Sequence, residues 1–169
     1  MPITHPGLQL TRLSGALPAW HGVIGQHDLL PICRNVRDGG GRLVALWGSD
    51  ERFPLPNPLP LAGEGANESL REFQVNGFAL HVVLVNESGL VCLALPLPAE
   101  QPVYEDISGI FPPANRMQRA MYDLLGIRAR EGRDQRKWLR HASWHSGSFP
   151  LRKDFDAAQN LTAELDNYP

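Results

Sequence analysis

The chain has 169 residues, of which 43% are hydrophobic and 20% charged, and its formal net charge at pH 7 is −2. These fractions are ordinary for a soluble globular protein, and the length predicts one domain that buries its own core. No apolar run reaches the roughly 18 residues of a membrane helix, and residues 1–13 lack the apolar stretch of a signal peptide. We therefore expect a soluble cytoplasmic protein without direct membrane insertion, unless a partner holds it at a membrane.

The charges are distributed unevenly along the chain. Residues 1–127 hold eight arginines and twelve acidic residues (−4), residues 128–154 hold eight basic and three acidic residues (+5), and residues 155–169 contribute −3. Arginine suits bidentate pairing with carboxylates at interfaces. Cys33 and Cys92 stand singly in apolar contexts, which predicts two buried free thiols, with a disulfide or a metal pair as the alternative.

The first half of the chain predicts two strands separated by a helix. Residues 1–18 are interrupted by proline and glycine and predict a loosely packed segment. Residues 20–25 predict a strand, residues 29–37 a helix with an N-cap offered by His27-Asp28, and residues 42–47 a second strand. Residues 54–72 are rich in proline and do not alternate, so we interpret them as an insertion between strands; a proline-rich recognition ligand is the alternative.

Two further strands and a helix follow. Residues 78–85 are apolar on both faces and predict a central strand, joined by a turn at 86–89 to an antiparallel strand at 90–95. His81 is expected to be a hydrogen-bonded histidine of the sheet. Pro112 and Pro113 fit a helix start, and Gly126 fits its C-terminal end. The apolar face of this helix is predicted to comprise Met117, Ala120, Met121, Leu124 and Leu125, and its polar face Arg116, Gln118, Arg119 and Asp123.

This element order predicts an α+β fold with a four-stranded, mostly antiparallel sheet and helices packed on one side, followed by an extended C-terminal arm. Residues 1–127 would form the core domain, including the insertion at about 54–72. Residues 128–169 would form a basic arm and an acidic tail. We expect the arm to leave the core and to be the least self-packed part of the isolated chain.

A set of short motifs stands in one order around the last helix: Ile110-Phe111-Pro112, Ala114-Asn115, Arg119, Tyr122-Asp123-Leu124, Gly126-Ile127 and Pro150 to Phe155. This order resembles the C-terminal signature of the C subunit (thirty-kilodalton subunit) of respiratory NADH dehydrogenase, which is shared with a component of NiFe hydrogenases of the formate-hydrogenlyase type. The sequence departs from the family pattern at Arg116, Gln118 and Ala120, where an aromatic residue and two glutamates are usual, and at Gly132-Arg133-Asp134.

The resemblance implies a non-catalytic assembly subunit whose arm lies on the large subunit of the complex, with a neighbouring iron–sulfur subunit as a possible second partner. The compact size, the lost acidic residues and the insertion favour the hydrogenase branch. The residues that it implies for partner binding are Arg116, Arg119, Tyr122, Asp123, Pro150, Leu151, Arg152, Lys153, Asp154 and Phe155.

Catalytic and cofactor motifs are missing from the sequence. There is no glycine-rich nucleotide loop and no C-x-x-C, so we expect no catalytic, cofactor-binding or metal residues. His141 and His145 have the spacing of zinc ligands but lack the rest of such a motif. Glu105 and Asp106 are interpreted as supporting the start of the helix. Nucleic-acid binding through the Arg- and Trp-rich segment 128–154, with Trp138 and Trp144 stacking on bases, is the alternative function.

Overall fold

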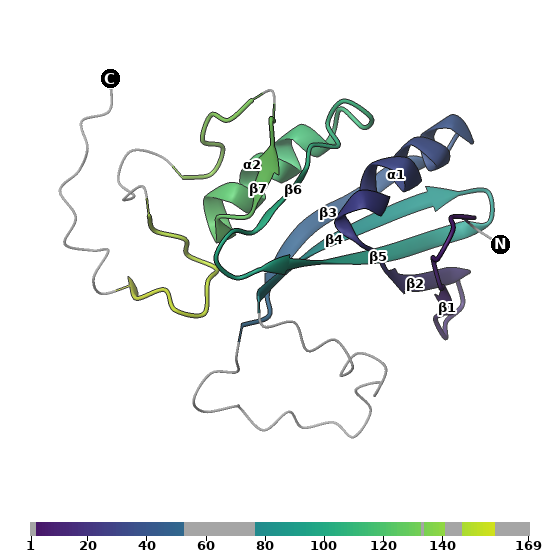
Figure 1. The fold of residues 1–169 in the computed structure, drawn as a ribbon, viewed down its shortest axis with the longest axis horizontal. Helices are drawn as coiled ribbons and strands as arrows, with labels where there is room; N and C mark the ends of the chain where they lie inside the picture. The colour runs from purple at the N-terminus through teal and green to yellow at the C-terminus, as the bar shows by residue number, and fades with distance from the viewer. Residues whose placement is uncertain (1–2, 53–76, 133, 141–146, 158–169) are drawn as a thin grey trace.

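The computed structural model describes residues 3–52, 77–132, 134–140 and 147–157. In chain order the elements are β1 (Thr11–Arg12), β2 (Ala19–Val23), a 3-10 turn (Gln26–Asp28), α1 (Leu29–Asp38), β3 (Arg42–Asp50), β4 (Gly77–Asn86), β5 (Gly89–Pro98), β6 (Val103–Glu105), α2 (Ala114–Leu125) and β7 (Arg128–Arg130) (Figure 1). The predicted α+β class is confirmed. The predicted insertion lies outside the described residues, as do His141, Trp144 and His145.

Five strands form the main sheet, in the order β1-β2-β5-β4-β3. The β3, β4 and β5 strands are antiparallel neighbours, and β2 joins the sheet parallel to β5. The four predicted strands are present, but the sheet has a fifth strand, because Thr11 pairs with His21 and Arg12 with Trp20. This short pairing falls within the segment that was predicted to be loosely packed.

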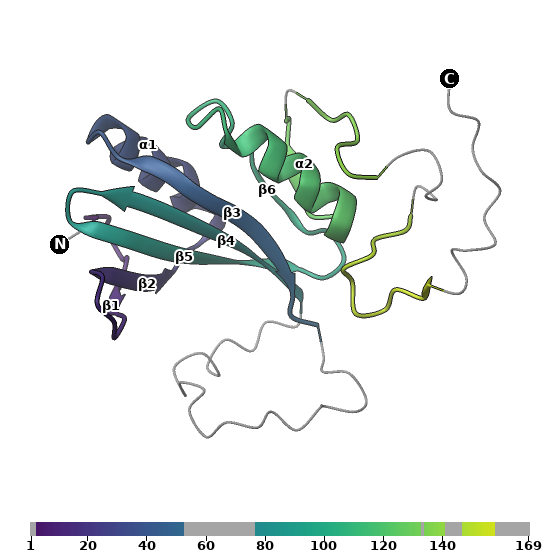
Figure 2. The same cartoon turned by 180° about the vertical axis from the view of Figure 1, so that it is seen from behind.

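Both helices lie on the same face of this sheet (Figures 1 and 2). Successive side chains of a strand point to opposite faces, so Phe78, Leu80 and Val82 of β4 point towards the helices. All three are fully buried in one hydrophobic cluster, to which α1 contributes Leu29 and Ile32. The buried apolar residues of β4 and β5 thus explain why one core supports both helices.

The opposite face of the sheet, which we call the outer face, carries exposed apolar side chains. Val23 is 42% exposed and Trp47 is 45% exposed, and Val44, which lies in a bulge of β3, is 48% exposed. The Trp47 ring stacks on His81 with 5.0 Å between ring centroids, and His81 Nε2 lies 2.8 Å from Ser49 Oγ. The expected hydrogen bond of His81 is therefore present. Burial lowers the pKa of His81, which favours the neutral ring.

Helix α2 begins after Pro113 and is followed by Gly126, as predicted, but its buried face differs from the predicted one. Gln118 and Asp123, assigned above to the polar face, are buried. The Gln118 amide accepts a hydrogen bond from the Ile107 N–H (3.2 Å) and donates one to Asp106 Oδ1 (2.7 Å). Both polar side chains are buried because their hydrogen bonds are made within the chain.

The two acidic residues before this helix, Glu105 and Asp106, make different contacts. Asp106 is linked to α2 through Gln118 and accepts a hydrogen bond from the Ser108 N–H (2.8 Å), whereas Glu105 pairs with Arg130 of β7 at 3.4 Å. Only Asp106 therefore supports the helix directly.

The cysteines are both free, but they differ in burial. Cys33 is buried in the core and Cys92 is half-buried, so the prediction of two buried thiols is correct only for Cys33. Burial raises the pKa of the Cys33 thiol to about 12.

Candidate partner-binding surface

The described parts of the arm do not leave the core domain as predicted. Immediately after α2, β7 pairs with β6 in parallel, and the Arg128 N–H donates to the Pro102 carbonyl (2.9 Å). Residues 134–140 and 147–157 then contact α2 and the end of β3 through the hydrogen bonds described below. The high polarity of the arm led to the expectation of an extended tail, but its polar groups bond to the core.

Asp123 of α2 is the main anchor of residues 138–140. Its side chain is only 1% exposed, and Oδ2 accepts hydrogen bonds from the N–H groups of Trp138 (2.6 Å), Leu139 (2.7 Å) and Arg140 (3.2 Å). Oδ1 lies 4.0 Å from Nε of Arg140, whose side chain is also buried. Three consecutive backbone donors thus converge on a single carboxylate oxygen.

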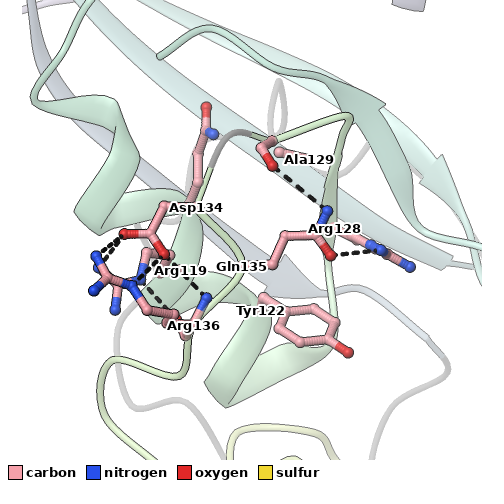
Figure 3. Close-up of a pocket in the computed structure, with 9 residues that line it drawn as sticks. Arg119, Tyr122, Arg128, Ala129, Asp134, Gln135 and Arg136 are labelled. Atoms are coloured by element: carbon pink, nitrogen blue, oxygen red, sulfur yellow. Dashed lines mark hydrogen bonds and ion pairs between the residues drawn. The ribbon is translucent and has the colours of Figure 1, made fainter.

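Arg119, one turn before Asp123, binds the residues that precede this site. Its guanidinium donates to the carbonyls of Arg136 (2.7 Å) and Lys137 (3.0 Å) and pairs with Asp134 Oδ2 (3.1 Å). Asp134 also accepts hydrogen bonds from Arg136. These bonds, together with the nearby positive charge of Arg119, hold the pKa of the Asp134 carboxyl well below its usual range. Asp134 lies between the two arginines (Figure 3). The pocket beside it, which Tyr122 also lines, has a volume of only about 30 Å³.

Trp138 and Leu139 remain accessible although their backbone is fixed. Trp138 is 40% exposed and Leu139 is 48% exposed. The guanidinium carbons of Arg116 and Arg119 each lie 5.1 Å from the centroid of the Trp138 ring, within the range of a cation–π contact. This part of the arm therefore presents an apolar pair bordered by cations.

Residues 149–152 cap the C-terminal end of α2. Arg152 Nε donates to the Leu125 carbonyl (2.6 Å) and the Leu151 N–H donates to the Leu124 carbonyl (3.0 Å), so two of the unpaired carbonyls of the helix are satisfied. The Arg152 guanidinium also lies over the Phe149 ring at 4.2 Å, next to Gly126. Gly126 has φ = 74°, which ends the helix in the left-handed conformation.

Arg52, just after β3, connects the arm to the sheet. It donates to both carboxylate oxygens of Asp50 (2.9 and 2.6 Å) and to both of Asp154 (3.0 and 2.8 Å). The Lys153 N–H donates to Asp50 Oδ2 (2.9 Å). Burial raises the pKa of Asp50, but hydrogen bonds from Arg52 and Lys153 outweigh it and lower the pKa to about 2. The Asp50 carboxylate therefore stays charged in the folded chain.

The ten residues that the resemblance implied thus fall into two groups. Five of them make side-chain hydrogen bonds within the chain: Arg119, Asp123, Arg152, Lys153 and Asp154. Of these, Asp123 is fully buried. The other five are exposed or half-buried on one side of α2 and along the arm: Arg116, Tyr122, Pro150, Leu151 and Phe155. We call this side of the molecule, together with residues 134–140, the arm surface.

Sequence reasoning missed several residues that build the arm surface, among them Asp50, Arg52, Asp134, Arg140 and Phe149. Arg140 donates to the Ser148 carbonyl and lies over the Phe149 ring at 4.9 Å. Arg52 and Asp154 are 102 positions apart in sequence, so no local pattern could have paired them. The arginine-rich composition of the arm was the only available signal.

The comparison with protein families decides the membership of the chain. Residues 23–161 match the family described as respiratory-chain NADH dehydrogenase, 30 Kd subunit. The chain belongs to this family. The match includes every residue that the resemblance singled out, from Ile110 to Phe155.

Two solved structures share the fold of this family member. One is the trypsin-resistant fragment (1–134) of Nqo5, which is 18% identical with a TM-score of 0.54; the alignment covers 76% of this chain and 89% of that one. The other is a chain of the membrane-bound sulfane sulfur reductase, an archaeal respiratory membrane complex, which is 13% identical with a TM-score of 0.61. That alignment covers 97% of this chain and 92% of that one.

The described residues contain no group of three or more His, Cys, Asp or Glu side chains that could hold a metal ion. None of the helices formed by these residues is long and apolar enough to span a bilayer.

Proposed function

We propose that this chain is a non-catalytic assembly subunit of a membrane-associated complex, either NADH:quinone oxidoreductase-like or of the NiFe hydrogenase type. The observation that carries the proposal is the family match over residues 23–161. The chain would dock on the large subunit through the arm surface and contact a neighbouring iron–sulfur subunit. It would be peripheral to the inner face of the cell membrane, held there by its partners.

The residues of the arm surface that bond within the chain and those that are exposed have different roles in this proposal. Asp123, Arg119 and Arg152 fix the backbone of the arm on α2, which reduces the conformational entropy that binding would otherwise remove. Leu151, which is 59% exposed, is then available as an apolar contact. Exposed apolar side chains on a fixed backbone are suited to the centre of a protein interface.

The test is direct binding of the full chain to the purified large subunit from the same organism, measured by biolayer interferometry. We expect binding that the Leu151→Asp variant weakens by at least about 10-fold, because a charge would be desolvated in the interface. Leu17→Asp is the matched control, since Leu17 is 70% exposed and precedes β2, outside the arm surface. No binding by the wild type, or equal losses in the two variants, would contradict the proposal.

A further inference from the structure

Trp138 and Leu139 form an adjacent pair of large apolar side chains on the arm surface, which we call the Trp138–Leu139 pair. Single apolar residues are common on protein surfaces and need no explanation. An exposed tryptophan next to an exposed leucine is less ordinary, because tryptophan is enriched among the residues that dominate binding energy. The structure offers two more reasons to treat this pair as a binding site.

The first reason is that the backbone which carries the pair is held in place before any partner arrives. Asp123 accepts the N–H groups of residues 138–140, and Arg119 donates to the carbonyls of residues 136 and 137. Five hydrogen bonds from two side chains of α2 thus fix five consecutive residues. A group presented in this way loses little further freedom on binding, so more of its contact energy appears as affinity.

The second reason is the charge around the pair. Five basic residues lie near it in the sequence or in space, Arg116, Arg119, Arg136, Lys137 and Arg140, and the nearby carboxylates are those of Asp123 and Asp134, which leaves a local charge of +3. Among the described residues, the ion pairs of this region join Asp134 to Arg119 and Arg136 and Asp123 to Arg140, and none involves Arg116 or Lys137. A guanidinium over an aromatic ring still has its N–H groups free to bind a carboxylate.

We infer that the Trp138–Leu139 pair is the anchor of the arm surface and inserts into an apolar pocket of the partner subunit that is bordered by carboxylates. This inference rests on the proposed function and names the chemistry of the partner. Charge complementarity selects the occupant, because Arg116 and Lys137 require acidic groups and the pair requires an apolar surface. Nucleic acid fits less well, since two guanidiniums over the Trp138 ring reduce the area on which a base could stack.

The experiment uses the full chain and the purified large subunit from the same organism. We expect Trp138→Ala to weaken binding by at least about 30-fold, the effect of removing a dominant interface residue, and Trp138→Phe to recover part of the loss. Trp47→Ala is the matched control, because Trp47 is equally exposed but lies on the outer face; it should change affinity by less than about threefold. Unchanged melting temperatures would show that the variants remain folded.

The charge component is tested with a second pair of variants. Arg116→Glu should weaken binding by at least about 10-fold and reduce its dependence on salt, whereas Arg34→Glu on the exposed side of α1 should do neither. If Trp138→Ala binds the large subunit as tightly as the wild type, or if Trp47→Ala loses as much affinity as Trp138→Ala, the inference is wrong although the proposed function stands. If the wild type does not bind the large subunit, both are wrong. If Trp138→Ala and Arg116→Glu both abolish binding of a single-stranded oligonucleotide by the chain yet leave its binding to the large subunit unchanged, the site binds nucleic acid instead.

Discussion

Replacing Asp123 by asparagine tests whether one buried carboxylate holds the arm on the core. Two effects oppose each other at this position. A negative charge in the last turn of a helix is unfavourable by about 0.3–1 kcal/mol, so its removal alone would stabilise α2. The carboxylate, however, accepts three backbone hydrogen bonds at 2.6–3.2 Å in a buried setting. A hydrogen bond to a charged group typically makes a net contribution of about 1.5–3 kcal/mol to stability.

The hydrogen bonds should prevail, because the substitution would also leave the buried Arg140 without its nearby carboxylate. Breaking one partner of a buried ion pair typically costs about 3–5 kcal/mol, and the relief at the helix end reduces this to about 3 kcal/mol. For a chain of this length, such a loss lowers the melting temperature by about 6–12 °C. Urea denaturation and hydrogen exchange of the amides of residues 138–140 measure the global and the local effects.

Asp38→Asn is the matched control for Asp123→Asn. Asp38 also pairs with an arginine, Arg37, but its side chain is 65% exposed, so its replacement should change stability by less than about 0.5 kcal/mol. The reasoning is refuted if Asp123→Asn unfolds at the wild-type urea concentration and the amides of residues 138–140 exchange at the wild-type rate.

Three further predictions concern the turn after α2, the Asp50 carboxylate and the buried thiol. Gly126→Ala should reduce the free energy of unfolding by about 2 kcal/mol, because an alanine at φ = 74° is strained and its Cβ would meet the Phe149 ring. Gly15→Ala is the control: its added Cβ would meet no atom within 4 Å, so it should leave the urea denaturation curve unchanged. Asp50 has a folded pKa of about 2, below the usual 3.8, so the stability from its bonds to Arg52 is complete above about pH 4 and is lost as the pH falls to 2. Asp50→Asn should therefore be less stable by about 2 kcal/mol at pH 7 and approach the wild type near pH 2, and equal pH profiles from acid denaturation would disprove this. Cys33 should resist alkylation at pH 8 until the chain unfolds, which mass spectrometry after thiol labelling in increasing urea would show; rapid labelling of the native chain would contradict the assigned burial.

Periodicity in the sequence was sufficient to predict the two helices and the four longer strands of the main sheet, but not the short parallel pair of β6 and β7. The strands at 78–85 and 90–95 follow from apolar runs divided by a turn, and α2 follows from Pro113, its apolar spacing and Gly126. Residues 11–12 were missed because a two-residue strand is too short to show an alternating pattern, and its pairing depends on β2 rather than on its own composition.

The resemblance names candidate residues of the arm surface, but the sequence does not give their arrangement. Gln118 and Asp123 were assigned to solvent because polar side chains usually lie there, and the sequence gives no sign that Asp123 meets backbone N–H groups 15 to 17 positions away. The contact of Arg52 with Asp154 depends on how the arm returns to the end of β3. Long-range pairing of this kind is a property of the fold and is not encoded in any local pattern.

The outer face of the sheet has a consequence for the colloidal behaviour of the chain. Val23, Val44 and Trp47 are exposed there, and a net charge of −2 gives only weak repulsion between copies. Exposed apolar area rather than folding stability should then limit the concentration at which the isolated subunit stays dispersed. A lysine at Val44 would raise this limit while leaving the melting temperature unchanged, because the residue lies in a bulge and contributes nothing to the packed core.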